Sequence, residues 1–142
     1  MKIESLLELH DDETRWEAPA NFDYAEARTR FAEFVDVLEA VFETSFQSET
    51  GLNIQDASFH SQIFFDSGLT RCHLIRFSNF GDMVAIADDD EIPLSLLIRL
   101  QAMLTQAGYT VVPFEYLEKP YTGLNAGVTG IDTWWIRYFD YV

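Results

Sequence analysis

The stretch SFHSQIFFDSGLTRCHLIRFSNFGDMVAIA, residues 58–87, decides the fold class of this chain. Apolar and polar residues alternate over 58–65 and again over 70–78, which is the period of side chains along a β-strand. The four residues between these runs, 66–69, read DSGL and are typical of a hairpin loop. A short connection of this kind predicts that the two strands pair antiparallel.

Further elements flank this hairpin. A turn at 79–82 leads into a short strand over 83–87, and two more strands are predicted over 109–117 and 133–142. Apolar residues recur at helical steps from Asp23 to about Phe46, and acidic residues fall mainly on the other side of that helix.

A second predicted helix begins at Pro93 and runs to about Ala107. It is apolar on most sides and is expected to be deeply buried. The elements together predict an α+β two-layer sandwich, in which two main helices pack on one face of a mainly antiparallel sheet of about five strands. No linker divides the chain, so residues 1–142 are expected to form a single domain.

The charge of the chain limits its partners. There are 24 Asp and Glu against 9 Lys and Arg, a formal net charge of −15, yet 48% of the residues are hydrophobic and 15% aromatic. Such a composition predicts a folded domain with a negative surface. The charge argues against nucleic acid and anionic membranes as partners, and it favours attraction to a basic protein. Many bacterial cytoplasmic proteins are acidic without such a role, which is the alternative.

Cysteine content and hydropathy indicate the compartment. Cys72 is the single cysteine, so no intrachain disulfide is expected. No basic and apolar leader opens the sequence, and no window approaches the length of a membrane span. These features predict a soluble cytoplasmic protein.

Two segments supply candidate partner-binding residues. Exposed carboxylates are expected on the first long helix, and large aromatic side chains with one cation are expected on a C-terminal strand where one face is left open. These candidate residues are Glu33, Asp36, Glu43, Trp135, Arg137 and Tyr141. The alternative for the strand is burial on both faces, which Arg137 weakens because a buried guanidinium needs a partner.

The predicted hairpin also gathers a polar cluster. If Phe65 lies opposite Thr70, one face carries polar side chains beside Ile75 and Phe77, and Cys72 falls on the apolar face. The polar residues are His60, Gln62, Arg71 and His73. Two histidines could form an acid–base or metal pair, but no third ligand stands at motif spacing, so no metal is predicted. An ordinary half-solvated sheet face is the alternative.

Two other segments have simple explanations. The run 88–91, DDDE, lacks the alternating ligands of a calcium loop and precedes a helix, where carboxylates are favoured by the helix dipole. The glycine-containing loop 119–132 matches no phosphate-binding motif, so no cofactor is predicted, but its length makes it a candidate partner or ligand loop.

We therefore predict an acidic binding protein, for example an immunity-type inhibitor of a basic toxin or nuclease. A small hydrolase or metal-dependent enzyme using His60 and His73 is one alternative. A homodimeric structural protein joined through its C-terminal strand is the other.

Overall fold

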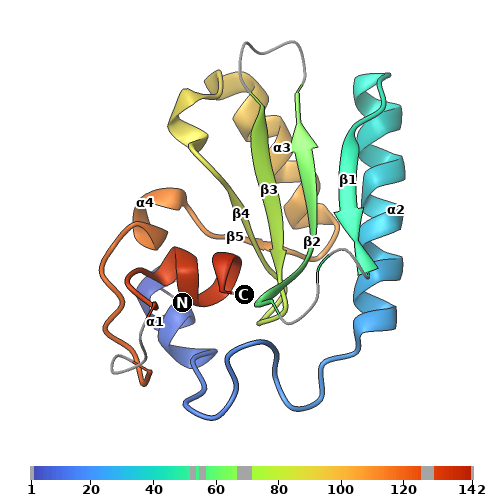
Figure 1. Cartoon of the computed structure of the whole chain (residues 1–142). Helices are drawn as coiled ribbons and strands as arrows, with labels where there is room; N and C mark the ends of the chain where they lie inside the picture. Colours follow the sequence, from blue (N-terminus) through green and yellow to red (C-terminus); the bar gives the residue numbers. More distant parts are fainter. Residues whose placement is uncertain (1, 52–53, 55–56, 67–71, 126–129, 142) are drawn as a thin grey trace.

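A five-stranded sheet forms the centre of the computed structural model, which describes residues 2–51, 54, 57–66, 72–125 and 130–141. The strands lie in chain order, and all neighbours are antiparallel except β4 and β5, which are parallel (Figure 1). The strands are β1 (Gln47–Thr50), β2 (Phe59–Phe65), β3 (His73–Ser78), β4 (Met83–Ile86) and β5 (Thr110–Val111). The predicted α+β class is confirmed.

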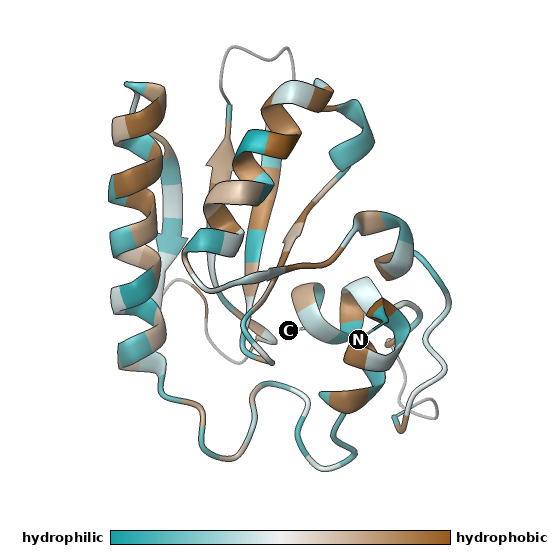
Figure 2. Ribbon diagram, turned by 180° about the vertical axis from the view of Figure 1, so that it is seen from behind, coloured by the Kyte–Doolittle hydropathy of each residue, from teal (hydrophilic) through white to brown (hydrophobic). Residues whose placement is uncertain are grey.

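Two long helices, α2 (Tyr24–Phe42) and α3 (Leu94–Gln106), cover one face of this sheet (Figures 1 and 2). Alternate residues of the central strands meet them, so that Ile63, Ile75 and Phe77 are wholly buried against Phe34 and Leu38. This apolar layer is the larger of the two hydrophobic clusters.

Helix α3 is less buried than its composition predicts. Leu100 and Leu104 are fully buried, but Leu94 is 71% exposed and Ile98 is 56% exposed. The expectation of deep burial is wrong because α3 contacts the sheet with one side only.

No helix of the described residues has both the length and the apolar character that crossing a membrane requires.

The opposite face of the sheet is covered at its β4 end. Val84 and Ile86 point to the α2–α3 layer, whereas Met83 and Ala85 join a second cluster. That cluster brings α1 (Ile3–Leu9) and the C-terminal helical segment together, at the lower left of the sheet in Figure 1. The short helices α4 (Phe114–Leu117) and η2 (Asp89–Glu91) complete the described elements.

The C-terminal segment is helical, so the predicted strand over 133–142 is wrong. A helical turn begins at Trp134 and widens into the π-helical η3 (Ile136–Asp140). Trp134 stacks on Tyr138, and Trp135 stacks on Phe139, with interplanar angles of 17° in both pairs. Each pair is separated by four residues, which is the spacing that brings side chains together on a helix.

Two other boundaries differ from prediction. Helix α2 ends at Phe42, earlier than the predicted end near Phe46, because Glu43 takes a left-handed conformation at φ 53°. The chain then enters β1, a strand that the sequence did not predict. In 109–117 only Thr110 and Val111 pair as a strand, because Pro113 begins the short helix α4.

Candidate functional site

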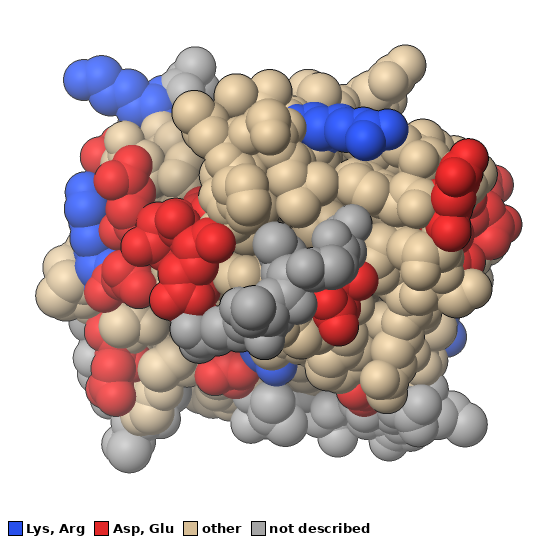
Figure 3. Space-filling view, turned by 90° about the horizontal axis from the view of Figure 1, so that it is seen from above, with Lys and Arg blue, Asp and Glu red and all other residues tan. Residues whose placement is uncertain are grey.

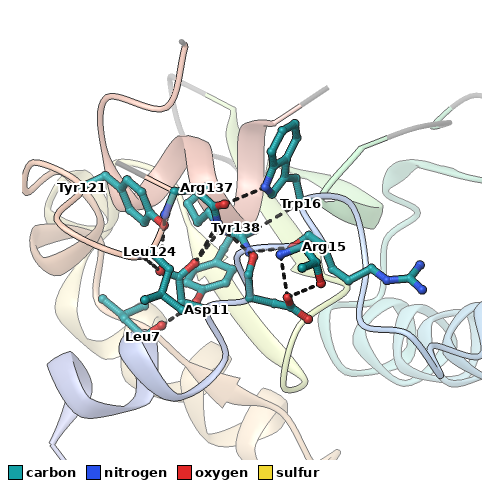
Figure 4. A network of polar contacts seen from close by, with 11 residues as sticks. Leu7, Asp11, Arg15, Trp16, Tyr121, Leu124, Arg137 and Tyr138 are labelled. Atoms are coloured by element: carbon teal, nitrogen blue, oxygen red, sulfur yellow. Dashed lines mark hydrogen bonds and ion pairs between the residues drawn. The ribbon is translucent and has the colours of Figure 1, made fainter. Parts of the chain in front are cut away.

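A buried ion pair joins the two ends of the chain (Figure 4). Arg137 is completely buried, and its Nε donates a 2.9 Å hydrogen bond to Oδ1 of Asp11, whose side chain is 1% exposed. The other guanidinium nitrogens donate to the backbone carbonyls of Asp12, Arg15 and Trp16. The guanidinium also lies 4.7 Å from the ring centre of Phe80. Each of the three guanidinium nitrogens therefore donates at least one hydrogen bond within the protein.

The second carboxylate oxygen of Asp11 anchors the loop that follows α4. It accepts hydrogen bonds from the Tyr121 hydroxyl and the Leu124 backbone N–H, both at 2.7 Å. The Tyr121 hydroxyl in turn accepts from the N–H of Asn125, whose side-chain oxygen accepts from the indole of Trp16. Asp11 thus ties three distant segments together, as the dashed lines of Figure 4 show.

This network changes the assignment of the C-terminal residues. Arg137 was predicted to bind a partner, and its complete burial contradicts that prediction. Trp135 and Tyr141 are half-buried. Trp135 packs on Phe114 and Phe139. Tyr141 contacts Trp16 edge-on, with 6.2 Å between the ring centres. The open strand that was to present them, and to join two copies, is a helix instead.

The register of the β2–β3 hairpin differs from the predicted one. Phe65 pairs with His73, not with Thr70, and a bulge interrupts the pairing between Phe59 and Ser61. The predicted diagonal contact of His60 with His73 is therefore wrong: His73 lies at the Phe65 end of the hairpin, and His60 lies at the bulge. The hydrolase alternative loses the histidine pair on which it was based.

Each of these histidines has a structural environment of its own. His60 is 5% exposed among the rings of Phe22, Phe31 and Phe77, and burial, aided by the charge of Arg28, lowers its pKa to about 4. His73 is buried too, and its Nδ1 lies 2.9 Å from the carbonyl oxygen of Ala87. Because a carbonyl only accepts, this Nδ1 carries the proton.

Gln62 of the predicted polar cluster takes part in a different set of contacts. Its side chain bridges Glu49 and Arg76, and Arg76 continues the chain of contacts to Asp140 and to the carbonyl of Phe139. Arg71 lies outside the described residues. Cys72 is exposed, against the predicted burial, because the shifted register places it before β3 begins.

The acidic run 88–91 forms the turn η2 ahead of α3, and Asp89 accepts a hydrogen bond from the backbone N–H of Phe114. Within the described ranges, no three His, Cys, Asp or Glu side chains gather as metal ligands. The loop 119–132 is described except for 126–129, and its described part holds Tyr121 and Asn125 against Asp11.

A pocket of about 350 Å³ opens between the 19–23 segment, the start of α2 and the β3–β4 turn. The residues that line the pocket include five with polar or charged side chains, Asp23, Glu26, Arg30, Asn79 and Asp82, and the aromatic residue Phe22.

The charged groups of this pocket are held by local structure. Asp23 caps α2 by accepting a 3.1 Å hydrogen bond from the N–H of Glu26. Arg30 pairs with Asp82 at 2.8 Å, and Asp82 follows Gly81 in a turn where both residues have positive φ. His10 packs against this turn, and burial lowers its pKa while Asp82 opposes that shift.

Asn79, one of the residues that line the pocket, has a buried side-chain acceptor. The residue is 2% exposed, and its Nδ2 donates to the carbonyls of Glu17 and Ala57. Its Oδ1 has no hydrogen-bond donor among the described residues. Turning the amide over would break both Nδ2 hydrogen bonds, so the unsatisfied atom is an oxygen.

The carboxylates predicted on the first long helix do reach solvent. Glu33, Asp36 and Glu43 are all exposed, and we name these three residues the α2 acidic face. Among the described residues none of the three forms an ion pair, whereas Arg30, Arg76 and Arg137 are each paired with an aspartate of the chain itself.

Comparison with protein-family models, curated proteins and solved structures gives no match to this chain.

Sequence reasoning missed Asp11 and Asn125 altogether. Asp11 precedes the first predicted helix and Asn125 stands in the glycine-containing loop 119–132, and nothing in their spacing indicates that they meet. The usable signal was Arg137 itself: a cation within an aromatic run needs a buried counter-ion somewhere in the chain.

Proposed function

We propose that this chain is an acidic binding protein that docks on a basic surface of another protein, as an immunity-type inhibitor docks on a basic toxin or nuclease. The observation that carries the proposal is the α2 acidic face, which is exposed and forms no ion pair with any residue that the structure describes, although the chain contains nine cationic residues. Three of those cations are engaged internally, so they do not offset the carboxylates at the surface.

The surface charge favours fast association with such a partner. Figure 3 shows several groups of Asp and Glu on the end of the molecule seen from above, with few Lys and Arg among them. Complementary charge raises association rates and suppresses unsuitable partners, while the exposed apolar side chains Val37 and Val41, on the same helix, can add desolvated contact area.

The proposal is tested by affinity capture followed by quantitative binding. The parent chain should retain one basic partner in a 1:1 complex, and the triple variant Glu33→Lys, Asp36→Lys and Glu43→Lys should associate with it roughly tenfold more slowly or worse. A control triple, Glu13→Lys, Glu115→Lys and Glu118→Lys, changes the net charge equally at other exposed positions. Equal losses in both triples, or capture of only neutral or acidic partners, would contradict the proposal.

A further inference from the structure

We propose that a groove between α2 and α3 binds an amphipathic, basic helix of the partner. The inference rests on the proposed function, and it adds the position of the contact and the structure of the partner segment. We name this surface the α2–α3 groove. It has a volume of about 450 Å³, and its lining includes Arg30, Glu33, Phe34, Val37, Val41 and Met103.

The groove follows about three turns of α2. The residues that α2 contributes recur at steps of three and four from Arg30 to Val41, so they form one stripe, which is about 16 Å long at the helical rise. Helix α3 runs beside α2 in the opposite direction (Figure 2). The guanidinium of Arg99, early in α3, lies 4.9 Å from the ring centre of Phe42, and that of Arg30 lies 4.9 Å from the ring centre of Tyr109, which follows α3.

Apolar side chains in this groove remain open to water. Phe34 is buried, but Val37 is 54% exposed and Val41 is 38% exposed, and Met103 on the opposite wall is half-buried. A partner that covered these side chains would gain the free energy of removing apolar surface from water. Methionine adapts its shape to the side chains that pack on it, which suits a binding surface.

The walls of the groove favour a helix over an extended strand as the occupant. Both walls are helices, and along their length the backbone N–H and C=O groups are hydrogen-bonded within α2 and α3. The groove therefore offers no backbone partners to an added strand, whose affinity depends on them. A helix satisfies its own backbone groups and inserts apolar side chains spaced three and four residues apart, which matches the stripe on α2.

The charges beside the groove favour a basic helix. Of the two charged residues in the lining, Arg30 is paired with Asp82 at 2.8 Å, whereas Glu33 forms no ion pair with any described residue. Asp36 and Glu43, the other members of the α2 acidic face, are exposed on the same helix. Lysine and arginine side chains along the docked helix are attracted by these carboxylates, and an acidic helix is repelled.

The same charges oppose a second copy of this chain as the occupant. Two copies joined symmetrically through the groove would place the same surface of each against the other. That arrangement would bring two α2 acidic faces together in chains that each carry a net charge of −15.

The test uses a synthetic helical peptide of about 18 residues, long enough for an isolated helix to form, with leucines along one side and lysines elsewhere. One analogue has the same composition with the leucines distributed around the helix, and another has glutamate in place of each lysine. Titrations are followed by nuclear magnetic resonance at the methyl groups of Val37, Val41 and Met103, with Ile98 as a reference outside the groove.

We expect saturable shifts at the three groove residues and none at Ile98 with the amphipathic lysine peptide. The analogue with distributed leucines should bind about tenfold more weakly, because it cannot place its apolar side chains in the groove together. The glutamate peptide should show no measurable binding, because like charges then face each other.

Two matched double variants locate the site. Val37→Ser with Val41→Ser removes apolar surface from the groove and should weaken binding of the lysine peptide about tenfold or more. Leu94→Ser with Ile98→Ser makes the same kind of change on α3, at residues that are 71% and 56% exposed and do not line the groove, and should change affinity less than about twofold. Serine and valine have similar helix propensities, so the groove variant keeps its fold.

Equal losses in the two serine variants, equal binding of the two lysine peptides, or binding of the glutamate peptide would each overturn the assignment. Shifts at Val37 that depend on protein concentration without peptide would overturn it as well, since a second copy would then occupy the groove. The serine variants keep all three carboxylates of the α2 acidic face, so these failures leave the proposed function standing. Failure of the proposed function would appear separately, as an unchanged association rate in the triple lysine variant.

Discussion

Arg137 and Asp11 form a 2.9 Å ion pair that solvent does not reach, although 125 residues lie between them in the chain. A buried pair of this kind adds little net stability against an apolar substitute, but removing one partner leaves a buried charge uncompensated. Removing either partner of this pair should therefore strongly destabilise the fold.

Replacing Asp11 by Asn should destabilise the protein by about 3–5 kcal/mol, since Arg137 keeps its charge and loses its counter-ion. The new amide group would also face the Tyr121 hydroxyl and the Leu124 N–H, which are donors already. Urea unfolding measures the change. As a control, Lys119→Met breaks the exposed 3.8 Å pair with Glu4 and should cost less than about 1 kcal/mol. Similar values for the two variants would show that the buried pair is not formed as described.

The two neighbouring tryptophans should differ in their contribution to stability. Trp134 is 6% exposed and packs on Tyr121 and Tyr138, so Trp134→Ala should cost about 3–5 kcal/mol. Trp135 is half-buried, so Trp135→Ala should cost less, about 1–2 kcal/mol. Thermal and urea melts of both variants check the order. A larger loss of stability for Trp135→Ala than for Trp134→Ala would mean that the C-terminal helix turns its other side to the core, against the structure described.

His60 should make stability depend on pH. Its pKa is lowered to about 4 in the folded state from the ordinary value of 6.5, so the unfolded chain binds the proton more readily between these values. The stabilisation is complete above about pH 6.5 and is lost as the pH falls towards 4, by about 3 kcal/mol in total. Urea unfolding of the parent and His60→Gln from pH 8 to 4 isolates this contribution, because other groups titrate in both proteins. Parallel pH profiles would contradict it.

The α2 acidic face should be dispensable for folding. Reversing Glu33, Asp36 and Glu43 to Lys breaks no side-chain hydrogen bond or ion pair among the described residues and relieves repulsion in a chain of charge −15, so the free energy of unfolding should change by less than about 1 kcal/mol. A thermal melt is sufficient to measure this. A triple variant that unfolds at room temperature would mean that α2 presents a different side to solvent.

The sequence was sufficient for the fold class because strong periodic signals agree with each other. The alternation over 58–65 and the helical steps from Asp23 correspond to β2 and α2, and Asp23 caps α2 by accepting a hydrogen bond from the N–H of Glu26. Register was not predictable in the same way. The connection between Phe65 and His73 is longer than the four residues assumed, and a bulge near Ser61 shifts the other end of β2.

The C-terminal segment failed for a different reason. Large side chains at 134, 135, 138 and 139 satisfy both a two-residue and a four-residue spacing, so periodicity alone does not separate strand from helix in so short a run. The choice depends on packing with Phe80 and on the ion pair to Asp11, which are contacts between distant parts of the chain. The same holds for the pocket, whose lining comes from α2 and from the β3–β4 turn.

The link between Asp11 and Arg137 also determines when this protein can become native in a cell. During synthesis Asp11 leaves the ribosome long before Arg137, because 125 residues lie between them. Until Arg137 has been synthesised, the emerging chain carries a carboxylate that is buried in the native structure but lacks the cation that pairs with it there. The N-terminal segment therefore completes its folding only after Arg137 has left the ribosome, and a ribosome that stalls before that point leaves the nascent chain exposed to proteases and chaperones.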